Sequence, residues 1–394
     1  MLVYLLIVIG FCMLYPLVPR KQVKWLLLAL VLALSIMAFN MVPYETDDIA
    51  NYYRQINQLR HGGFQELKRL VGENANNWGA LPVCGVYFYF ISFLPDNGFL
   101  PAITIFLAYG SMYLVLWLAA NRFNVGKWYL FLAAFFILST YWFYDICSGI
   151  RNGLVFTLFS SIVYIDVVEK KIRPLCWLAY VVLLGMHSSA IILFFIRIVL
   201  LLSGRGKGKV LSILMVVSMV SGGVLLPHLG EITGVEYFEL ISEKAERASE
   251  NMGVNSSTSF VVNVSVFILC AMVVIYCFYV FSKTDKNKDI NRYSKFVQFL
   301  LFFMLGSVFS ALIFLRLARW VLPAMVSVVF MVGMQTAKDR EKEMHANKKH
   351  KSVIKEGTLI SSNELVVNFC FVTYSLVHLW YACAGSSLIW LHFS

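Results

Sequence analysis

The sequence is poor in charge and lacks the short motifs that mark many soluble enzymes. Only 14% of its 394 residues are Asp, Glu, Lys or Arg, and it contains no GxGxxG, no Walker loop, no HExxH and no Cys–His metal spacing. Its eight cysteines form no CxxC pair and lie mostly within apolar runs, which indicates packing residues rather than a metal site or a disulfide framework. These absences argue against nucleotide-driven chemistry.

Long apolar runs are what the chain has instead. Apolar residues make up 59% of it, and the mean hydropathy is +0.73. Runs of 17 to 22 apolar residues recur, which is the length that a helix needs to cross roughly 30 Å of hydrocarbon. We therefore predict an all-α polytopic integral membrane protein with about 10 to 13 transmembrane or broken helices, folded as a single domain over residues 1–394. The expected spans include 128–146 and 210–226.

The net charge of +11 is explained by loop orientation rather than by nucleic acid binding. Of the 33 Lys and Arg residues, 23 fall in six short connections. Basic residues concentrate in the cytoplasmic loops of membrane proteins. The connections predicted to be cytoplasmic are 20–24, 122–127, 170–173, 205–209, 283–295 and 338–360.

This assignment puts two large loops, 43–80 and 227–258, on the outer face. The first contains an amphipathic stretch that is predicted to lie flat on the membrane surface, with apolar residues at helical spacing: Ile49, Tyr52, Tyr53, Ile56 and Leu59. The apolar segment 81–94 is too short to cross comfortably and is predicted to be re-entrant. Segment 175–202 is either two half-helices broken near 185–187 or one long tilted helix.

Four arginines are not explained by loop orientation: Arg151, Arg197, Arg316 and Arg319. All except Arg197 are predicted at the outer ends of spans, against the usual charge bias. One interpretation is snorkelling to the headgroups or pairing with Asp145. The other is an anion site, because several guanidinium groups match phosphate oxygens and keep their charge.

Two kinds of titratable side chain are candidates for acid–base chemistry. His187 lies among small residues at the predicted helix break, where it is either a hydrogen-bonded packing residue or a functional group. Asp47 and Asp48 follow the second span, where one caps the next helix and the other is available as a general base.

A set of short motifs occurs in an order that resembles one family. These are Asp48-x-x-Asn51-Tyr52, Arg151-Asn152-Gly153, the His-Ser-Ser-Ala stretch 187–190, and Arg316-x-x-Arg319-Trp320. Together they resemble the EpsG-like, Wzy-type bacterial polysaccharide polymerases over roughly residues 40–330. The chain departs from the family at Asn152, where the usual residue is glutamine.

The resemblance implies a GT-C-like glycosyltransferase architecture in the bacterial inner membrane, with a site that faces the periplasm or cell exterior. Its substrates would be oligosaccharide repeat units on undecaprenyl pyrophosphate, and its partner a chain-length regulator. No metal or cofactor is expected, and transfer would invert the anomeric centre. The roles implied are pyrophosphate binding by Arg151, Arg316 and Arg319, base catalysis by Asp48 or His187, and cavity lining by Asn51, Tyr52, Asn152 and Ser188.

Three other activities fit the same residues. A ligase would move finished glycan to another acceptor, and it shares its leaving group with the polymerase. A flippase or transporter of lipid-linked sugars would use the arginines for binding alone. A membrane O-acyltransferase would use His187 as its base and would need an activated acyl donor.

Overall fold

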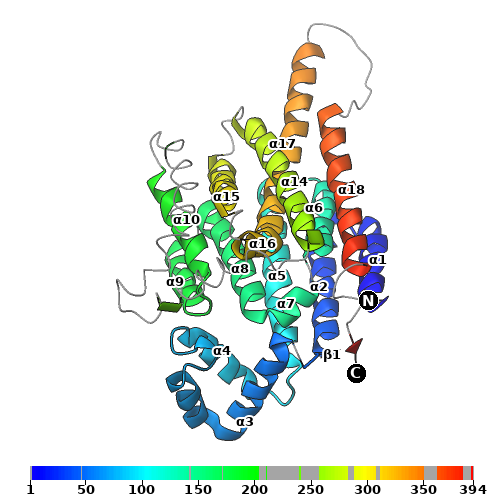
Figure 1. Ribbon diagram of the computed structural model, residues 1–394. Helices are drawn as coiled ribbons and strands as arrows, with labels where there is room; N and C mark the ends of the chain where they lie inside the picture. Colours follow the sequence, from blue (N-terminus) through cyan, green and yellow to red (C-terminus); the bar gives the residue numbers. More distant parts are fainter. Residues whose placement is uncertain are drawn as a thin grey trace.

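The computed structural model describes residues 2–203 except 46, 142 and 171, the short pieces 210 and 239–240, and residues 257–282, 288–307, 311–349, 362–384 and 392–393. Figure 1 shows a bundle of helices. The helices are α1 (Leu2–Leu17), α2 (Val23–Phe39), α3 (Asp48–Gly72), α4 (Pro82–Ser92), α5 (Phe99–Arg122), α6 (Lys127–Thr140), α7 (Phe143–Ser148), α8 (Ile150–Tyr164), α9 (Arg173–Leu184), α10 (Ala190–Leu202), α14 (Ser257–Ser282), α15 (Lys288–Gly306), α16 (Ala311–Trp320), α17 (Leu322–Lys349) and α18 (Ser362–Ala384).

Smaller elements connect these helices. Two short 3-10 helices, η1 (Arg20–Gln22) and η2 (Ala75–Asn77), precede α2 and α4, and a π-helical segment, η3 (Ile165–Glu169), extends α8. Strand β1 (Met41–Val42) pairs antiparallel with β2 (His392–Phe393). This pairing ties the last described residues of the chain to the segment that leads into α3.

The helical membrane-protein fold is confirmed, but the number of spans is lower than predicted. Among the described residues, four helices are long and apolar enough to cross a membrane, or five if the pair α16–α17, bent by 43°, is one span. Six further apolar helices have 10 to 17 residues. The predicted span 210–226 lies outside the described residues apart from 210, and so does the predicted outer loop 227–258 apart from 239–240 and 257–258.

Chain breaks within apolar runs account for part of this difference. The predicted span 128–146 is divided at Tyr141 into α6, with 14 residues, and α7, with six. At 1.5 Å per residue α6 is only about 21 Å long, which is less than the hydrocarbon thickness. The hydropathy of residues 128–146 predicted one continuous span and did not reveal the break at Tyr141.

The predicted cytoplasmic segments gather at one end of the bundle. The Arg20 guanidinium donates to the carbonyl of Ala120 at 3.1 Å, and the Gly126 amide donates to the Gln335 side chain at 2.8 Å. The first contact joins segment 20–24 to the last turn of α5, which leads into segment 122–127. The second joins segment 122–127 to the part of α17 that continues into 338–349.

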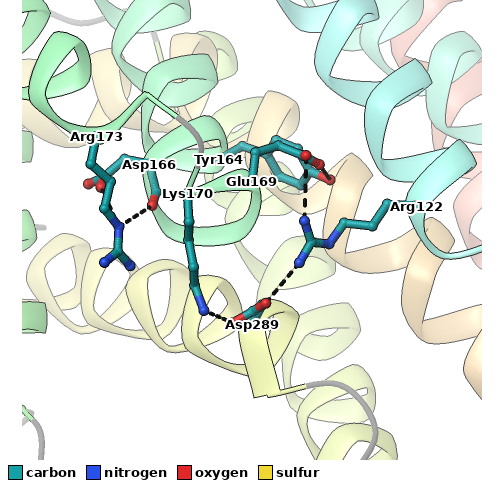
Figure 2. A network of polar contacts seen from close by, with 7 residues as sticks. All are labelled: Arg122, Tyr164, Asp166, Glu169, Lys170, Arg173 and Asp289. Carbon is teal, nitrogen blue, oxygen red and sulfur yellow. Dashed lines mark hydrogen bonds and ion pairs between the residues drawn. The ribbon is translucent and has the colours of Figure 1, made fainter.

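Figure 2 shows the same end of the bundle from close by, where Asp289 of α15 pairs with both Arg122 and Lys170. Nη2 of Arg122 lies 2.8 Å from the Asp289 carboxylate, and Nη1 of the same guanidinium lies 3.5 Å from the Glu169 carboxylate. Five of the six basic segments therefore lie at one end, which we call the basic end; segment 205–209 is outside the described residues. Such gathering agrees with loops that share one side of a membrane.

Helices α3 and α4 form a layer at the opposite end (Figure 1). The amphipathic helix is confirmed: Ile49, Tyr52, Ile56 and Leu59 are buried, while the Tyr53 side chain is partly exposed. The chain bends at Gly63, whose φ of +57° is a left-handed value that favours glycine. The bend keeps the second half of α3 against α4.

The break in segment 175–202 is confirmed, and the alternative of one long tilted helix is wrong. Helix α9 ends at Leu184 and α10 begins at Ala190. Gly185 lies between them, where its carbonyl accepts a hydrogen bond from the Val83 amide of α4 at 3.1 Å. A Cβ on Gly185 would come within 2.7 Å of the Val83 side chain. The small residue at the break therefore lets α4 approach closely.

A close helix contact deep in the bundle gives a first testable prediction. A Cβ on Gly333 of α17 would overlap the Sγ atom of Cys277 on α14 and lie 2.9 Å from its Cβ. Gly333→Ala should therefore destabilise the fold by about 1–3 kcal/mol, the usual cost of overpacking. Cys277→Ala in the same chain should restore part of the loss. Thermal unfolding of the purified variants in detergent tests this, and a neutral Gly333→Ala would show that α14 and α17 pack less closely.

Candidate functional site

Four helices meet around Arg151 at the α3 end of the bundle. Arg151 lies in the first turn of α8, and its Nε donates to the Tyr52 hydroxyl of α3 at 3.1 Å. The guanidinium carbon lies 5.5 Å from the centre of the Tyr52 ring. A further hydrogen bond joins Arg151 to Cys84 of α4. The charge is thus held in place by α3 and α4 at the edge of the bundle.

A second guanidinium, that of Arg316 on α16, joins this group. Arg316 interacts electrostatically with Arg151, which repels it, and with Asp48 of α3, which attracts it. Within the described part of the chain, Arg316 has neither a hydrogen-bond partner nor an ion-pair partner. We call Asp48, Tyr52, Arg151 and Arg316 the arginine site. It holds two positive charges and one negative charge, which favours an anionic ligand.

Burial raises the pKa of the Tyr52 phenol, and the neighbouring Arg151 charge opposes that rise in part. The phenol is therefore protonated at neutral pH. It accepts the hydrogen bond from Arg151 and keeps its own hydrogen to donate. Tyr52 is thus suited to orient a ligand oxygen and not to remove a proton.

The two neighbouring aspartates have different surroundings. Asp47 precedes the first turn of α3, and its carboxylate accepts hydrogen bonds from the Tyr44 amide at 3.0 Å and the Tyr144 hydroxyl at 2.6 Å. It therefore organises the loop before α3. Asp48, in the first helical turn, is exposed and close enough to Arg316 to interact with it. Of the two carboxylates, Asp48 is the better placed to act on a bound ligand.

His187 lies in the break between α9 and α10, with only 4% of its surface exposed. Its Nδ1 accepts a hydrogen bond from the Ser189 amide at 3.1 Å, so a neutral ring carries its proton on Nε2 and presents a donor there. The ring centre is 6.2 Å from Phe156, which stacks on Trp320 at 5.9 Å. These aromatic contacts connect His187 to α8 and α16.

Arg319 is engaged in an ion pair. Its Nη1 lies 3.0 Å from the Asp145 carboxylate of α7, and its Nε donates to the Asn263 side chain of α14 at 3.3 Å. Of the two interpretations of this arginine, the contacts favour pairing with Asp145. Arg319 therefore holds α7, α14 and α16 together beside the arginine site.

The predicted cavity residues differ in their exposure. Asn51 and Asn152 are partly buried, and the Asn152 Oδ1 atom has no hydrogen-bond partner among the described residues. Ser188, beside His187, is 2% exposed. Asn51 lies on α3 three residues after Asp48, and Asn152 lies on α8 directly after Arg151, so each belongs to a helix that contributes to the arginine site.

Sequence reasoning assigned Cys84 to packing and missed its contact with Arg151. Cys84 lies in α4, two residues after the proline at the start of the helix, and is fully buried. No charge or spacing in the LPVCG stretch points to the arginine, because the contact joins segments more than 60 residues apart. Only the packing of α4 against α3 and α8 reveals it.

The described residues contain no group of three or more His, Cys, Asp or Glu side chains that could hold a metal ion. Comparison with known proteins adds no relative to these observations. A scan against protein-family models, a search of the curated proteins and a search of the solved structures each found no match.

Proposed function

We propose that this protein is a polysaccharide repeat-unit polymerase. It would transfer a growing glycan from undecaprenyl pyrophosphate to the next lipid-linked repeat unit at the outer face of the bacterial inner membrane. The observation that carries the proposal is the convergence of Arg151 and Arg316 beside Asp48 and Tyr52. The order of motifs that resembles the EpsG-like, Wzy-type polymerases supplies the substrate class.

The chemistry follows from the charges of the arginine site. The acceptor hydroxyl attacks the anomeric carbon, and the bond from that carbon to the pyrophosphate oxygen breaks. Negative charge then develops on the leaving pyrophosphate. In this mechanism Arg151 and Arg316 stabilise that charge, because preorganised donors lower the free energy of the transition state where charge develops.

The proton of the attacking hydroxyl needs an acceptor. Asp48 is exposed and interacts with Arg316, so in this mechanism it takes the proton as general base. His187 has Nδ1 engaged with the Ser189 amide, which favours a positioning role for its ring. Direct attack on the carbon that bears the pyrophosphate inverts its configuration.

The positions of the arginine site and the basic segments at opposite ends of the helix bundle support the proposed orientation of the protein in the membrane. The arginine site includes residues of α3, and the basic segments gather at the opposite end of the bundle. If the basic end faces the cytoplasm, as the charge bias of membrane loops favours, the arginine site faces outward. An outward site also suits the proposed GT-C-like architecture.

The test is genetic complementation in a bacterium that carries the gene. A deletion strain should accumulate single lipid-linked repeat units at the outer face, and wild type should restore a ladder of polymer. Arg151→Ala should not restore it at equal protein level, because the remaining arginine has to stabilise the leaving group alone. Gel ladders and mass spectrometry of the lipid-linked glycan supply the measurement.

Other outcomes identify the rival activities. Full-length glycan that stays on its lipid carrier in the deletion strain would indicate a ligase. Repeat units trapped at the cytoplasmic face would indicate a flippase or transporter. Loss of acetyl groups from an otherwise complete polymer would indicate an O-acyltransferase. Each of these results would overturn the polymerase proposal.

A further inference from the structure

A second cluster of arginines lies at the basic end, away from the arginine site. Its centre is Asp166 in the π-helical segment η3, which is fully buried. The Arg197 guanidinium of α10, only 3% exposed, lies 2.6 Å from the Asp166 carboxylate, and the Tyr180 hydroxyl donates to the same carboxylate at 3.2 Å. Arg173, at the start of α9, approaches Asp166 at 3.8 Å (Figure 2).

The charges of this cluster do not balance. Arg292 of α15 is close enough to be repelled by both Arg173 and Arg197 and attracted by Asp166. Three guanidinium groups therefore share one buried carboxylate. Asp289 also attracts Arg292, but it already pairs with Arg122 and Lys170 and therefore offsets only part of this positive charge.

Two further observations indicate that this cluster of arginines can bind an anion. Nη1 of Arg197 is buried and has no hydrogen-bond partner in the described part of the chain. Arg173 is at the N-terminus of α9, where unpaired amides and the helix dipole favour negative charge, and its side chain is 45% exposed. Anions from the surroundings can therefore reach Arg173.

The helix that begins at Arg173 also presents an apolar face to the surroundings. Leu175, Leu178, Val181 and Val182 are exposed by 59%, 60%, 59% and 43%. They fall on one side of α9, and α9 and α10 form one side of the bundle (Figure 1). A long apolar stripe thus starts where the excess positive charge lies.

We propose that this end of α9 binds one anionic phospholipid of the leaflet at the basic end. Arg173 and Arg292 hold its phosphate beside Arg197, and an acyl chain lies along the Leu175–Val182 stripe. Basic clusters between helices at the cytoplasmic membrane surface suit such head groups, while the stripe supplies the apolar contact that a free phosphate cannot use. This site is independent of the proposed transfer reaction, since it lies at the other end of the bundle.

Native mass spectrometry of the full-length protein in detergent tests the site, with phosphatidylglycerol and phosphatidylcholine as probes. The test variant is Arg173→Gln with Arg292→Gln, which leaves the Asp166–Arg197 pair intact. The matched control is Lys21→Gln with Lys24→Gln, since both lysines are exposed and belong to a basic segment at the same end. Wild type and control should retain one phosphatidylglycerol. The test variant should bind it about 30-fold more weakly, from about 1 kcal/mol per lost cation.

Three results would overturn the proposal. Undiminished phosphatidylglycerol binding by the test variant would remove the arginines from the site. Equal retention of phosphatidylcholine would reduce it to an ordinary apolar surface. Displacement of the lipid by inorganic phosphate at comparable concentration would identify free phosphate as the ligand. If the double variant is unstable in thermal unfolding, Arg173→Gln alone should show a loss of about fivefold by the same reasoning.

Discussion

Arg316→Lys should lower glycan transfer by about 100-fold, the effect of losing one preorganised donor to a developing oxyanion. Lysine keeps the positive charge but cannot present two parallel donors to phosphate oxygens. Arg316 has no ion-pair partner among the described residues, so the substitution breaks no salt bridge that those residues show. The protein level in the membrane should therefore stay close to wild type while turnover falls.

The measurement is polymer formation by purified protein from lipid-linked repeat units, normalised to the amount of folded protein. Arg54→Lys is the matched control, because Arg54 is an exposed arginine on α3 at the same end of the bundle. It should retain wild-type turnover. Equal activity of Arg316→Lys and Arg54→Lys would remove Arg316 from the reaction and leave the polymerase proposal without its second guanidinium.

Local pattern predicted those features that depend on local chemistry. Apolar residues at helical spacing predicted α3, because burial of one face of a helix is recorded in the spacing itself. The charge parity of the loops, with small residues near Gly185, predicted the break before α10. Arg151 and Asp48 were identified as candidate site residues because a charge at the end of an apolar span costs free energy unless it is paired, hydrated or functional.

Features that depend on contacts between distant segments were not predictable in the same way. The partner of Arg197 is Asp166, which lies on another helix 31 residues away. Neither apolar run contains a pattern that indicates this pairing. Asp145 was recognised as one possible partner of the outer arginines. The choice of Arg319, 174 residues away, follows from the packing of α7 against α16. Span number failed for a related reason, since turns such as that at Tyr141 are fixed by tertiary packing.

Asp166→Ala should have the largest effect on stability, a loss of about 3–5 kcal/mol, which is typical when one partner of a buried ion pair is removed. Asp166 is fully buried and Arg197 is 3% exposed, so the substitution leaves a buried guanidinium without its counterion. The repulsion between Arg197 and Arg292 is then no longer offset by the Asp166 charge. Chemical denaturation of the purified protein in detergent measures the loss.

A variant that lacks both charges of the Asp166–Arg197 pair distinguishes two contributions to the free energy of unfolding. One is the penalty of an unpaired buried charge, and the other is the stabilisation by the ion pair itself. Asp166→Leu with Arg197→Met should lie within about 1–2 kcal/mol of wild type, because replacing a buried ion pair with apolar side chains is often close to neutral. Arg197→Met alone should cost less than Asp166→Ala, since Arg173 still lies 3.8 Å from the remaining carboxylate. If the double variant were as unstable as Asp166→Ala, the loss would come from packing around η3, and the excess positive charge at the basic end would not govern its stability.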